Sequence, residues 1–474
     1  MRKLFILVTV IVILGPGLVR AEIDFDRFFE DKTMRVDYYH TGIKTQEIIS
    51  LDQIREEPIW AGSKVNLIDT LNLGKYLFKV FDAKTNQMIY SRGFSSIYGE
   101  WETTDEAAKR IWRTFSESVR FPYPRGPVQL AIAVRDEGGY FKDIFSTVID
   151  PGSHYVNREP PASDVQVISV QKKGKPEKKV DLLILGDGYT GDEMDKFRAD
   201  VDRFVKDLFD VSPFKERRND FNVWAIEVVS QDSGPDQPHL GIFRKTALGC
   251  SYNTFGSPRY MLTFENKAFR EIAANAPYDQ LYFIVNSNQY GGGGIFNLYS
   301  TTYTHAEKEA ESWWPDYVFV HEFGHSFGGL GDEYYSSSIA YTDFYSPGVE
   351  PWEPNVTAAK DLEHLKWNDL VDKDLPVPTP WDKEEYDKLD AERRSLKKDD
   401  PDYEKKLTDI TQRLSDFLKH HEHAGKVGLF EGSGYVSEGL YRPSIDCRMF
   451  TKSLVGFCPV CRRAIERMID FYTE

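Results

Sequence analysis

The sequence has few cysteines, a deficit of basic residues and, after its first residues, no long apolar run. Only four of its 474 residues are cysteine, which excludes the dense disulfide framework of small secreted domains. Acidic residues outnumber basic ones by 75 to 59, so the formal net charge is −16. Because affinity for nucleic acid rests on lysine and arginine side chains that neutralise phosphates, this charge argues against a nucleic-acid partner.

The first 21 residues are typical of a signal peptide. Arg2 and Lys3 precede an apolar run over residues 4–14, and Val19-Arg20-Ala21 offers small residues before a cleavage site. An uncleaved membrane anchor is the alternative, but the run is shorter than the roughly 20 residues that a spanning helix needs. We expect residues 1–21 to be removed, which shifts the net charge to −19 through the loss of three basic residues. The mature chain would then have no transmembrane segment and be secreted, periplasmic or held at the cell surface.

The four cysteines allow three disulfide pairings in an exported chain. The sequence CPVC at 458–461 invites a redox or zinc interpretation, but a redox motif is expected near a βαβ unit and a zinc ribbon needs a second CxxC. Neither is present, so we expect structural roles for Cys458 and Cys461. Cys447 is close enough in sequence for a local disulfide.

Residues 22–160 alternate short apolar stretches with turns, as in KYLFKVFDA at 75–83 and VQLAIAVRD at 128–136. Several short strands with such punctuation predict an antiparallel β-sandwich. Residues 103–119 have helical spacing instead and are expected to form a helix that connects the sheets. The proline-rich NREPPASD at 157–164 marks the expected boundary of this domain.

Residues 165–474 alternate strand-like and helix-like segments, which is typical of an α/β domain. With the β-sandwich before it, the expected fold class of the chain is multidomain α+β. A buried-type strand followed by a turn is expected at 180–189, further strands at 219–230 and 278–287, and an amphipathic helix at 191–209. Further helices are expected at 265–276 and from about 312 to 327.

A highly charged segment at about 377–423 interrupts this second domain. Its two helical halves are divided by Asp399-Asp400-Pro401, which predicts an exposed helical hairpin inserted into the fold. His420, His421 and His423 at its end could bind a metal, although the solvated end of a helix is the better interpretation.

HEFGH at 321–325 is the motif that carries chemistry. On a helix, His321 and His325 project from one face about one turn apart, so both imidazoles can reach a single zinc ion. Glu322 beside them need not bind the ion and would act as the general base on a water whose pKa the zinc lowers. A core helix with satisfied histidines is the alternative, but the apolar YVFV before the motif and the acidic pair that follows favour a metal site.

Several long motifs in the same order carry a resemblance to a known family, and they are HEFGHSFGGLGDEY, LGDGYTGDEM, GCSYNTFGSPRYM, YGGGGIFNLYS and GLYRPSIDCRMF. Together they resemble the IgA-peptidase family of bacterial zinc metallopeptidases over roughly 180–470, and residues 22–160 resemble the N-terminal domain of that family. The resemblance implies a metzincin-like catalytic domain with one Zn²⁺ per chain.

The HEFGH motif does not identify the third zinc ligand. In the metzincin pattern HExxHxxGxxH it falls six residues after the second histidine, which here is Gly331. A turn through the glycines at 328, 329 and 331 would bring the next residue, Asp332, back to the ion. We favour Asp332, with Glu333 or a distant glutamate or histidine as alternatives, and expect the acid that does not bind to orient an imidazole.

Three further roles follow from the metzincin-like comparison. Residues 295–303 are the candidate edge strand that pairs with an extended substrate. Met449 is the candidate hydrophobic floor beneath the metal, and Tyr441 could donate to a developing oxyanion. The glycine run at 291–294 is not expected to bind phosphate, because it lacks the Lys-Ser/Thr pair and the following helix of a phosphate-binding loop.

The sequence therefore predicts an exported zinc-dependent endopeptidase that hydrolyses protein substrates, with a host glycoprotein or immunoglobulin among the candidates. The alternative is a surface glycan- or protein-binding module whose zinc site is structural or degenerate. Glu322 argues against that alternative, because a structural site has no use for an unligated base.

Overall fold

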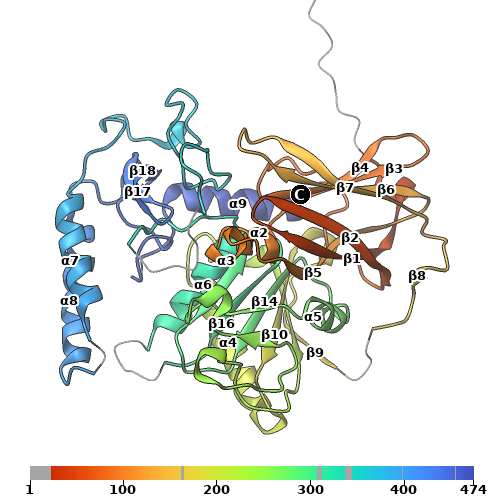
Figure 1. Cartoon of the computed structure of the whole chain (residues 1–474), viewed down its shortest axis with the longest axis horizontal. Coiled ribbons are helices and arrows are strands. Elements are labelled where there is room, and N and C mark those ends of the chain that lie inside the picture. Colours follow the sequence, from red (N-terminus) through yellow and green to blue (C-terminus); the bar gives the residue numbers. More distant parts are fainter. Residues whose placement is uncertain (1–22, 162–164, 307–311, 337–343, 398, 454) are drawn as a thin grey trace, which may run out of the picture.

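The computed structural model describes residues 23–161, 165–306, 312–336, 344–397, 399–453 and 455–474. The expected signal peptide at 1–21 therefore lies outside the described residues. The chain forms a mixed α/β structure with a distinct N-terminal domain, which is red to orange in Figure 1. No helix in these ranges is long and apolar enough to cross a membrane.

The N-terminal domain contains two four-stranded sheets. The first has the order β5-β1-β2-β8 and the second the order β4-β3-β6-β7. The strands are β1 (Phe29–Ile43), β2 (Gln46–Glu57), β3 (Tyr76–Asp82), β4 (Met88–Phe94), β5 (Arg113–Pro124), β6 (Val128–Arg135), β7 (Phe141–Ile149) and β8 (Val156–Asn157), with the short helix α1 (Phe25–Phe28) before them. Along β3, Tyr76, Phe78 and Val80 are buried and alternate with more exposed neighbours, as the pleat of a half-buried strand requires. One hydrophobic core joins the two sheets, with Val36 on β1 and Ile132 on β6 among its members.

The helix expected at 103–119 is wrong. Two short helices, α2 (Ile97–Trp101) and α3 (Asp105–Ala108), come first, and residues 113–124 form β5. Arg110 has a left-handed backbone with φ of 60°, which ends helical propagation. These residues form a strand and not a helix because β5 pairs with β1 along its length and buries Phe115 and Phe121.

The second domain is built on a six-stranded sheet of order β15-β16-β14-β10-β11-β9. Its strands are β9 (Gln166–Gln171), β10 (Val180–Asp187), β11 (Phe221–Glu227), β14 (Gln280–Val285), β15 (Gly292–Ile295) and β16 (Tyr299–Tyr303). The strands β16, β14, β10 and β11 are parallel, whereas β15 and β9 are antiparallel edges. The central strand β10 is buried at every position, as expected of a strand covered on both faces. Between β11 and β14 in the chain, β12 (Cys250–Ser251) and β13 (Leu262–Thr263) form a short two-stranded ribbon.

Helices cover this sheet, and one of them carries the histidine motif. They are α4 (Met194–Leu208), α5 (Asn266–Ala273), α6 (Trp314–Ser326) and the C-terminal α9 (Pro459–Thr473). The motif helix α6 is buried around most of its circumference, because the Phe319 ring stacks between Tyr282 of β14 at 4.0 Å and Phe204 of α4 at 4.8 Å. This packing fixes α6 against the sheet near its β15 edge.

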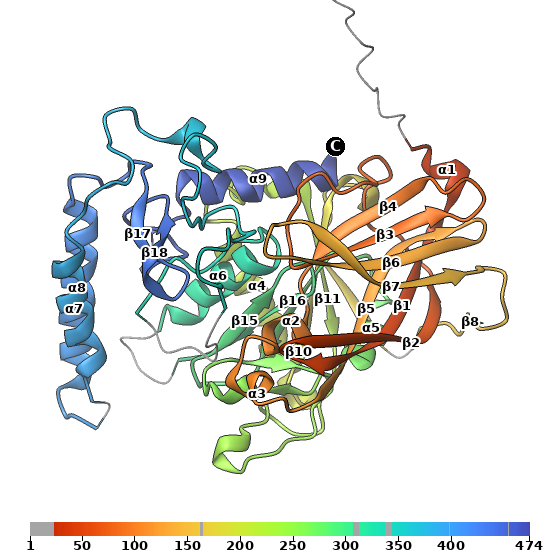
Figure 2. The same ribbon diagram turned by 45° about the horizontal axis from the view of Figure 1, so that its top comes forward.

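The charged insertion forms the expected helical hairpin, α7 (Lys383–Ser395) and α8 (Tyr403–His420), which stands at one side of the molecule in Figures 1 and 2. It is less exposed than predicted, because Tyr386, Leu414 and Leu418 belong to the core of the second domain. The chain then returns through the ribbon β17 (Phe430–Ser433) and β18 (Val436–Arg442) to α9.

Buried ion pairs connect the two domains. Arg35 of β1 is fully buried and contacts both Glu57 at 2.9 Å and Glu271 of α5 at 2.5 Å. Arg55 of β2 pairs with the other oxygen of Glu271 at 3.0 Å. A bidentate carboxylate shared by two guanidinium groups gives the contact a defined geometry.

Candidate metal centre

Helix α6 brings the two histidines of the motif together. The Nε2 atoms of His321 and His325 lie 3.1 Å apart, one turn of helix from each other. Gly324, between them, is packed so tightly that a Cβ there would come within 3.1 Å of the Met449 sulfur. Met449 is fully buried, and its sulfur packs against the segment of α6 between the two histidines.

Asp332 completes the group. Its Oδ1 lies 3.1 Å from Nε2 of His321 and 3.2 Å from Nε2 of His325. The chain returns to the histidines because α6 ends at Ser326 and Gly329 takes the left-handed conformation with φ of 63°. Tyr435 donates to the other oxygen of Asp332 at 2.7 Å, which fixes the carboxylate in place.

The hydrogen bonds of the two histidine Nδ1 atoms show that the Nε2 atoms face Asp332. Nδ1 of His321 lies 3.0 Å from the carbonyl oxygen of Arg448, and Nδ1 of His325 lies 2.6 Å from that of Leu330. Because a carbonyl oxygen only accepts, both Nδ1 atoms are donors, and each ring in its neutral form presents an Nε2 lone pair to the same point as the Asp332 oxygen. Three electron-pair donors so close together fit a metal ion: ligand bonds of about 2.0–2.2 Å place the donors of a tetrahedral site roughly 3.3–3.5 Å apart.

The charges support the same interpretation. Burial raises the pKa of the Asp332 carboxyl, but the two imidazoles outweigh it and hold this pKa well below the ordinary range. Burial lowers the pKa of His325, but the charge of Asp332 outweighs it and raises this pKa to about 10. A metal ion that binds here must therefore displace a proton from His325.

Glu322 lies beside this group without joining it. Its side chain is half-buried and lines the same cleft as the histidines. Burial raises its pKa above the ordinary value, although the two histidines act in the opposite direction. A carboxyl with a raised pKa can both accept and return a proton near neutral pH.

The glycine run explains how a strand comes so close to α6. A Cβ at Gly294 would lie 2.4 Å from the backbone oxygen of Glu322, and one at Gly292 would lie 3.3 Å from the Glu322 Cγ. These glycines form the edge strand β15, whereas residues 299–303 form the interior strand β16. The predicted edge strand at 295–303 is therefore misplaced by one strand, because glycine is depleted in strands and a glycine run gives no local strand signal.

A cleft of about 890 Å³ opens over the metal centre. Its walls come from the N-terminal domain, the sheet edge with its preceding loop and the helical hairpin, and they include Ser95, Glu100, Arg259, Gly292, Gly293, Gly294, Tyr334, Tyr386, Arg393, Leu407 and Leu414. Tyr441 is not among its lining residues and pairs through its backbone with Thr357, so its oxyanion role stays a prediction from the sequence. Tyr435 and the Arg448 carbonyl are the contacts that sequence reasoning missed.

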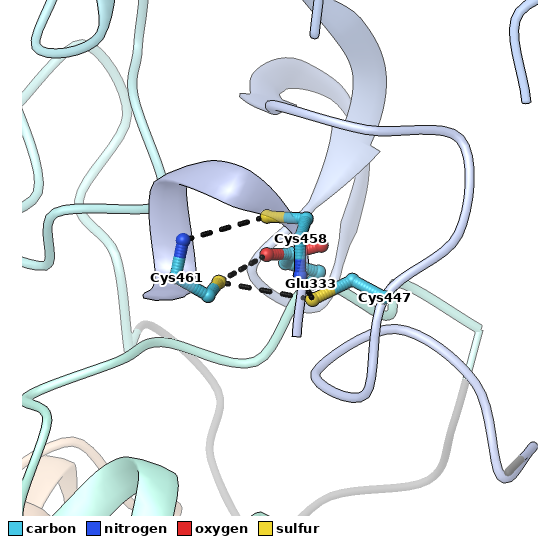
Figure 3. Close-up of side chains that lie close together, drawn as sticks. All are labelled: Glu333, Cys447, Cys458 and Cys461. Carbon is cyan, nitrogen blue, oxygen red and sulfur yellow. Dashed lines mark hydrogen bonds between the residues drawn. The ribbon is translucent and has the colours of Figure 1, made fainter. Parts of the chain in front are cut away.

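Glu333 accepts from Asn355 and from the Cys461 thiol, whereas both histidine Nδ1 atoms face backbone carbonyls, so the prediction that this acid orients an imidazole is wrong. Glu333 belongs to a second group with Cys447, Cys458 and Cys461, shown in Figure 3, in which all four side chains are buried. The cysteines are free thiols in the structure, with no local disulfide. The histidines at the end of the hairpin belong to neither of the two groups found among the described residues.

The first group, two histidines and an aspartate that line a cleft, is one that could hold a metal ion. The family model IgA Peptidase M64 matches residues 168–469, and the model Peptidase M64 N-terminus matches residues 24–146. The chain belongs to the IgA peptidase M64 family and is therefore a peptidase. No curated protein matches it in a sequence search.

Proposed function

We propose that this protein is an exported zinc endopeptidase in which His321, His325 and Asp332 hold the ion and Glu322 is the general base. The observation that carries the proposal is the contact triangle of 3.1–3.2 Å between two imidazole nitrogens and one carboxylate oxygen, with Glu322 beside it in a large cleft. When bound, zinc supplies a Lewis acid for the scissile carbonyl and lowers the pKa of water.

Residues of this chain would perform the remaining steps. Glu322 accepts a proton from the attacking water and returns it to the leaving amine, for which its raised pKa is suited. The Arg448 and Leu330 carbonyls hold the imidazoles in the tautomer that directs Nε2 at the ion. The aromatic walls of the cleft limit access of bulk water.

The strand β15 is the proposed binding edge for an extended peptide. Gly292 donates to the carbonyl of Arg259 and accepts from Met261, so its backbone faces the outer edge of the sheet. By strand alternation the N–H and C=O of Gly294 face the same way, nearer to His325. Residues 259–261 already occupy the edge groups of Gly292, so a substrate strand would pair with Gly294 and run past His325.

The finer fold and the biological setting belong to the same proposal. We propose that residues 22–160 are a β-sandwich that positions protein substrates and that residues 165–474 are a metzincin-like catalytic domain. Cleavage after Ala21 would export the chain, with a host glycoprotein or immunoglobulin as a candidate substrate. The binding-module alternative is not supported, because family membership and an unligated Glu322 in the cleft both favour catalysis.

The experiment that tests this function is proteomic profiling of cleaved substrates. A complex protein mixture is incubated with the wild-type chain and with Glu322→Ala, and new peptide termini are identified by mass spectrometry. The proposal expects termini that require Glu322. An identical set of termini with both proteins would refute it.

A further inference from the structure

The group formed by Glu333, Cys447, Cys458 and Cys461 plays no part in the steps above. Its potential ligand atoms, three sulfurs and a carboxylate oxygen, all lie within 4.8 Å of one another. The sulfurs of Cys447 and Cys461 are 3.7 Å apart, and the Cys461 sulfur is 3.2 Å from Oε1 of Glu333 (Figure 3). We infer that these four side chains form a second, structural zinc site.

The distances match a tetrahedral site. With Zn–S bonds of about 2.3 Å and a Zn–O bond of about 2.0 Å, neighbouring sulfurs lie roughly 3.8 Å apart and a sulfur and an oxygen roughly 3.5 Å apart. The observed separations of 3.7 and 3.2 Å are close to these values. Three cysteines and one carboxylate supply the four ligands of a closed site.

The backbone around the group is suited to thiolates. Cys458 is the N-cap of α9, and its sulfur accepts from the backbone N–H of Cys461 at 3.5 Å. The backbone N–H of Cys458 in turn donates to the Cys447 sulfur at 3.3 Å. Backbone donors and the positive end of a 15-residue helix favour negative sulfurs.

A disulfide explains the group less well. It would join two of the three sulfurs and leave the third unpaired, and the 3.7 Å between the sulfurs of Cys447 and Cys461 far exceeds a bond of about 2.05 Å. Glu333 is fully buried, and its Oε2 has no hydrogen-bond partner among the described residues. A buried carboxyl next to thiols is costly as a carboxylate unless a cation neutralises it, and otherwise takes up a proton.

The second site is coupled to the first through neighbouring residues. Glu333 follows Asp332, and Cys447 precedes Arg448, whose carbonyl accepts from His321. The Glu333 backbone also donates to the carbonyl of Met449 at 2.8 Å. A structural ion would therefore fix both the third ligand of the catalytic metal and the carbonyl that orients His321, although binding of that ion does not require peptidase activity.

The test is metal stoichiometry with identification of the ligands. The purified full chain should contain two zinc ions, and the double variant His321→Ala/His325→Ala should contain one. Replacing that remaining zinc by cobalt(II) should produce a thiolate-to-cobalt charge-transfer band. This double variant leaves all four proposed ligands intact, so the test stands even if cysteine variants do not fold.

The cysteine variants provide the matched comparison. Cys458→Ser/Cys461→Ser should reduce two zinc ions to one and abolish the charge-transfer band, whereas Cys250→Ala, a buried cysteine remote in sequence from this group, should change neither. The inference is overturned if the folded histidine double variant is metal-free and all four of its cysteines titrate as thiols after denaturation. A Cys447–Cys461 disulfide found by mass spectrometry in the purified wild-type chain would overturn it equally.

Discussion

Asp332 and Glu333 are neighbours in the chain, yet their carboxylates serve two different groups of ligands. Asp332 meets the imidazoles of His321 and His325, and Glu333 meets the thiol of Cys461 at 3.2 Å. These two adjacent residues thus link the two centres. A substitution of Asp332 should change binding of the ion at the histidines, and a substitution of Glu333 should change binding of the ion at the cysteines.

Substituting these two acids one at a time should separate the two centres. Asp332→Ala removes a ligand of the histidine site, so the zinc that remains should be bound by sulfur. Glu333→Gln should instead lose the sulfur-bound ion and retain zinc bound by nitrogen and oxygen. X-ray absorption at the zinc edge distinguishes the two sets of ligands, and the reverse assignment would exchange the roles of the two residues.

Tyr435 should determine the affinity of the histidine site without binding the ion. Tyr435→Phe removes the hydrogen bond to Oδ2 of Asp332, and loss of such an outer contact costs about 10–100-fold in metal affinity. Competition with a zinc chelator measures the change. Tyr441→Phe, remote from the cleft lining, is the control, and equal losses in both variants would contradict the assignment.

Gly294 should be needed for the close approach of β15 to α6. Gly294→Ala would place a Cβ 2.4 Å from a backbone oxygen, so α6 or β15 must shift, at a cost of about 1–3 kcal/mol in unfolding free energy. Peptidase activity should fall with it. Gly126→Ala, which would meet nothing within 4 Å, is the control, and a Gly294→Ala variant with unchanged stability would refute the packing argument.

His40 should make the stability of the N-terminal domain depend on pH. Burial lowers its pKa, but Glu117 and Glu47, at 3.0 and 2.9 Å, outweigh burial and raise it from 6.5 to about 9. Because the folded-state pKa is the higher one, the stabilisation is complete below about pH 6.5 and is lost as the pH rises through about 9, a change of about 3 kcal/mol.

Denaturant unfolding at several pH values between 6 and 10 measures this dependence. His40→Gln should abolish most of the slope, whereas the exposed His239→Gln should keep it. A wild-type chain whose stability is flat across that range would contradict the prediction.

Much of the second domain could be predicted from its sequence because its signals are local. Four consecutive apolar residues lie at the centre of the strand at 180–187, and the helix of the histidine motif follows from spacing alone. Asp332 could be favoured over Glu333 by chain geometry, since three glycines in four residues permit the return.

Other features depend on partners far apart in sequence. Residues 113–124 become a strand because β1 pairs with them, which no local spacing reveals. The glycines of β15 form a strand because α6 lies against them. The cysteine group lacks a second CxxC, and its other members, Glu333 and Cys447, come from separate segments that only the fold brings together.

The most direct test of the account is an anomalous difference map, recorded at the zinc absorption edge from crystals of the full chain. It should show a peak about 2.0–2.2 Å from Nε2 of His321, Nε2 of His325 and an oxygen of Asp332, with Glu322 nearby but outside bonding distance. A map with no peak there from protein that contains zinc, or a peak with Glu322 as a ligand, would contradict the proposed catalytic centre.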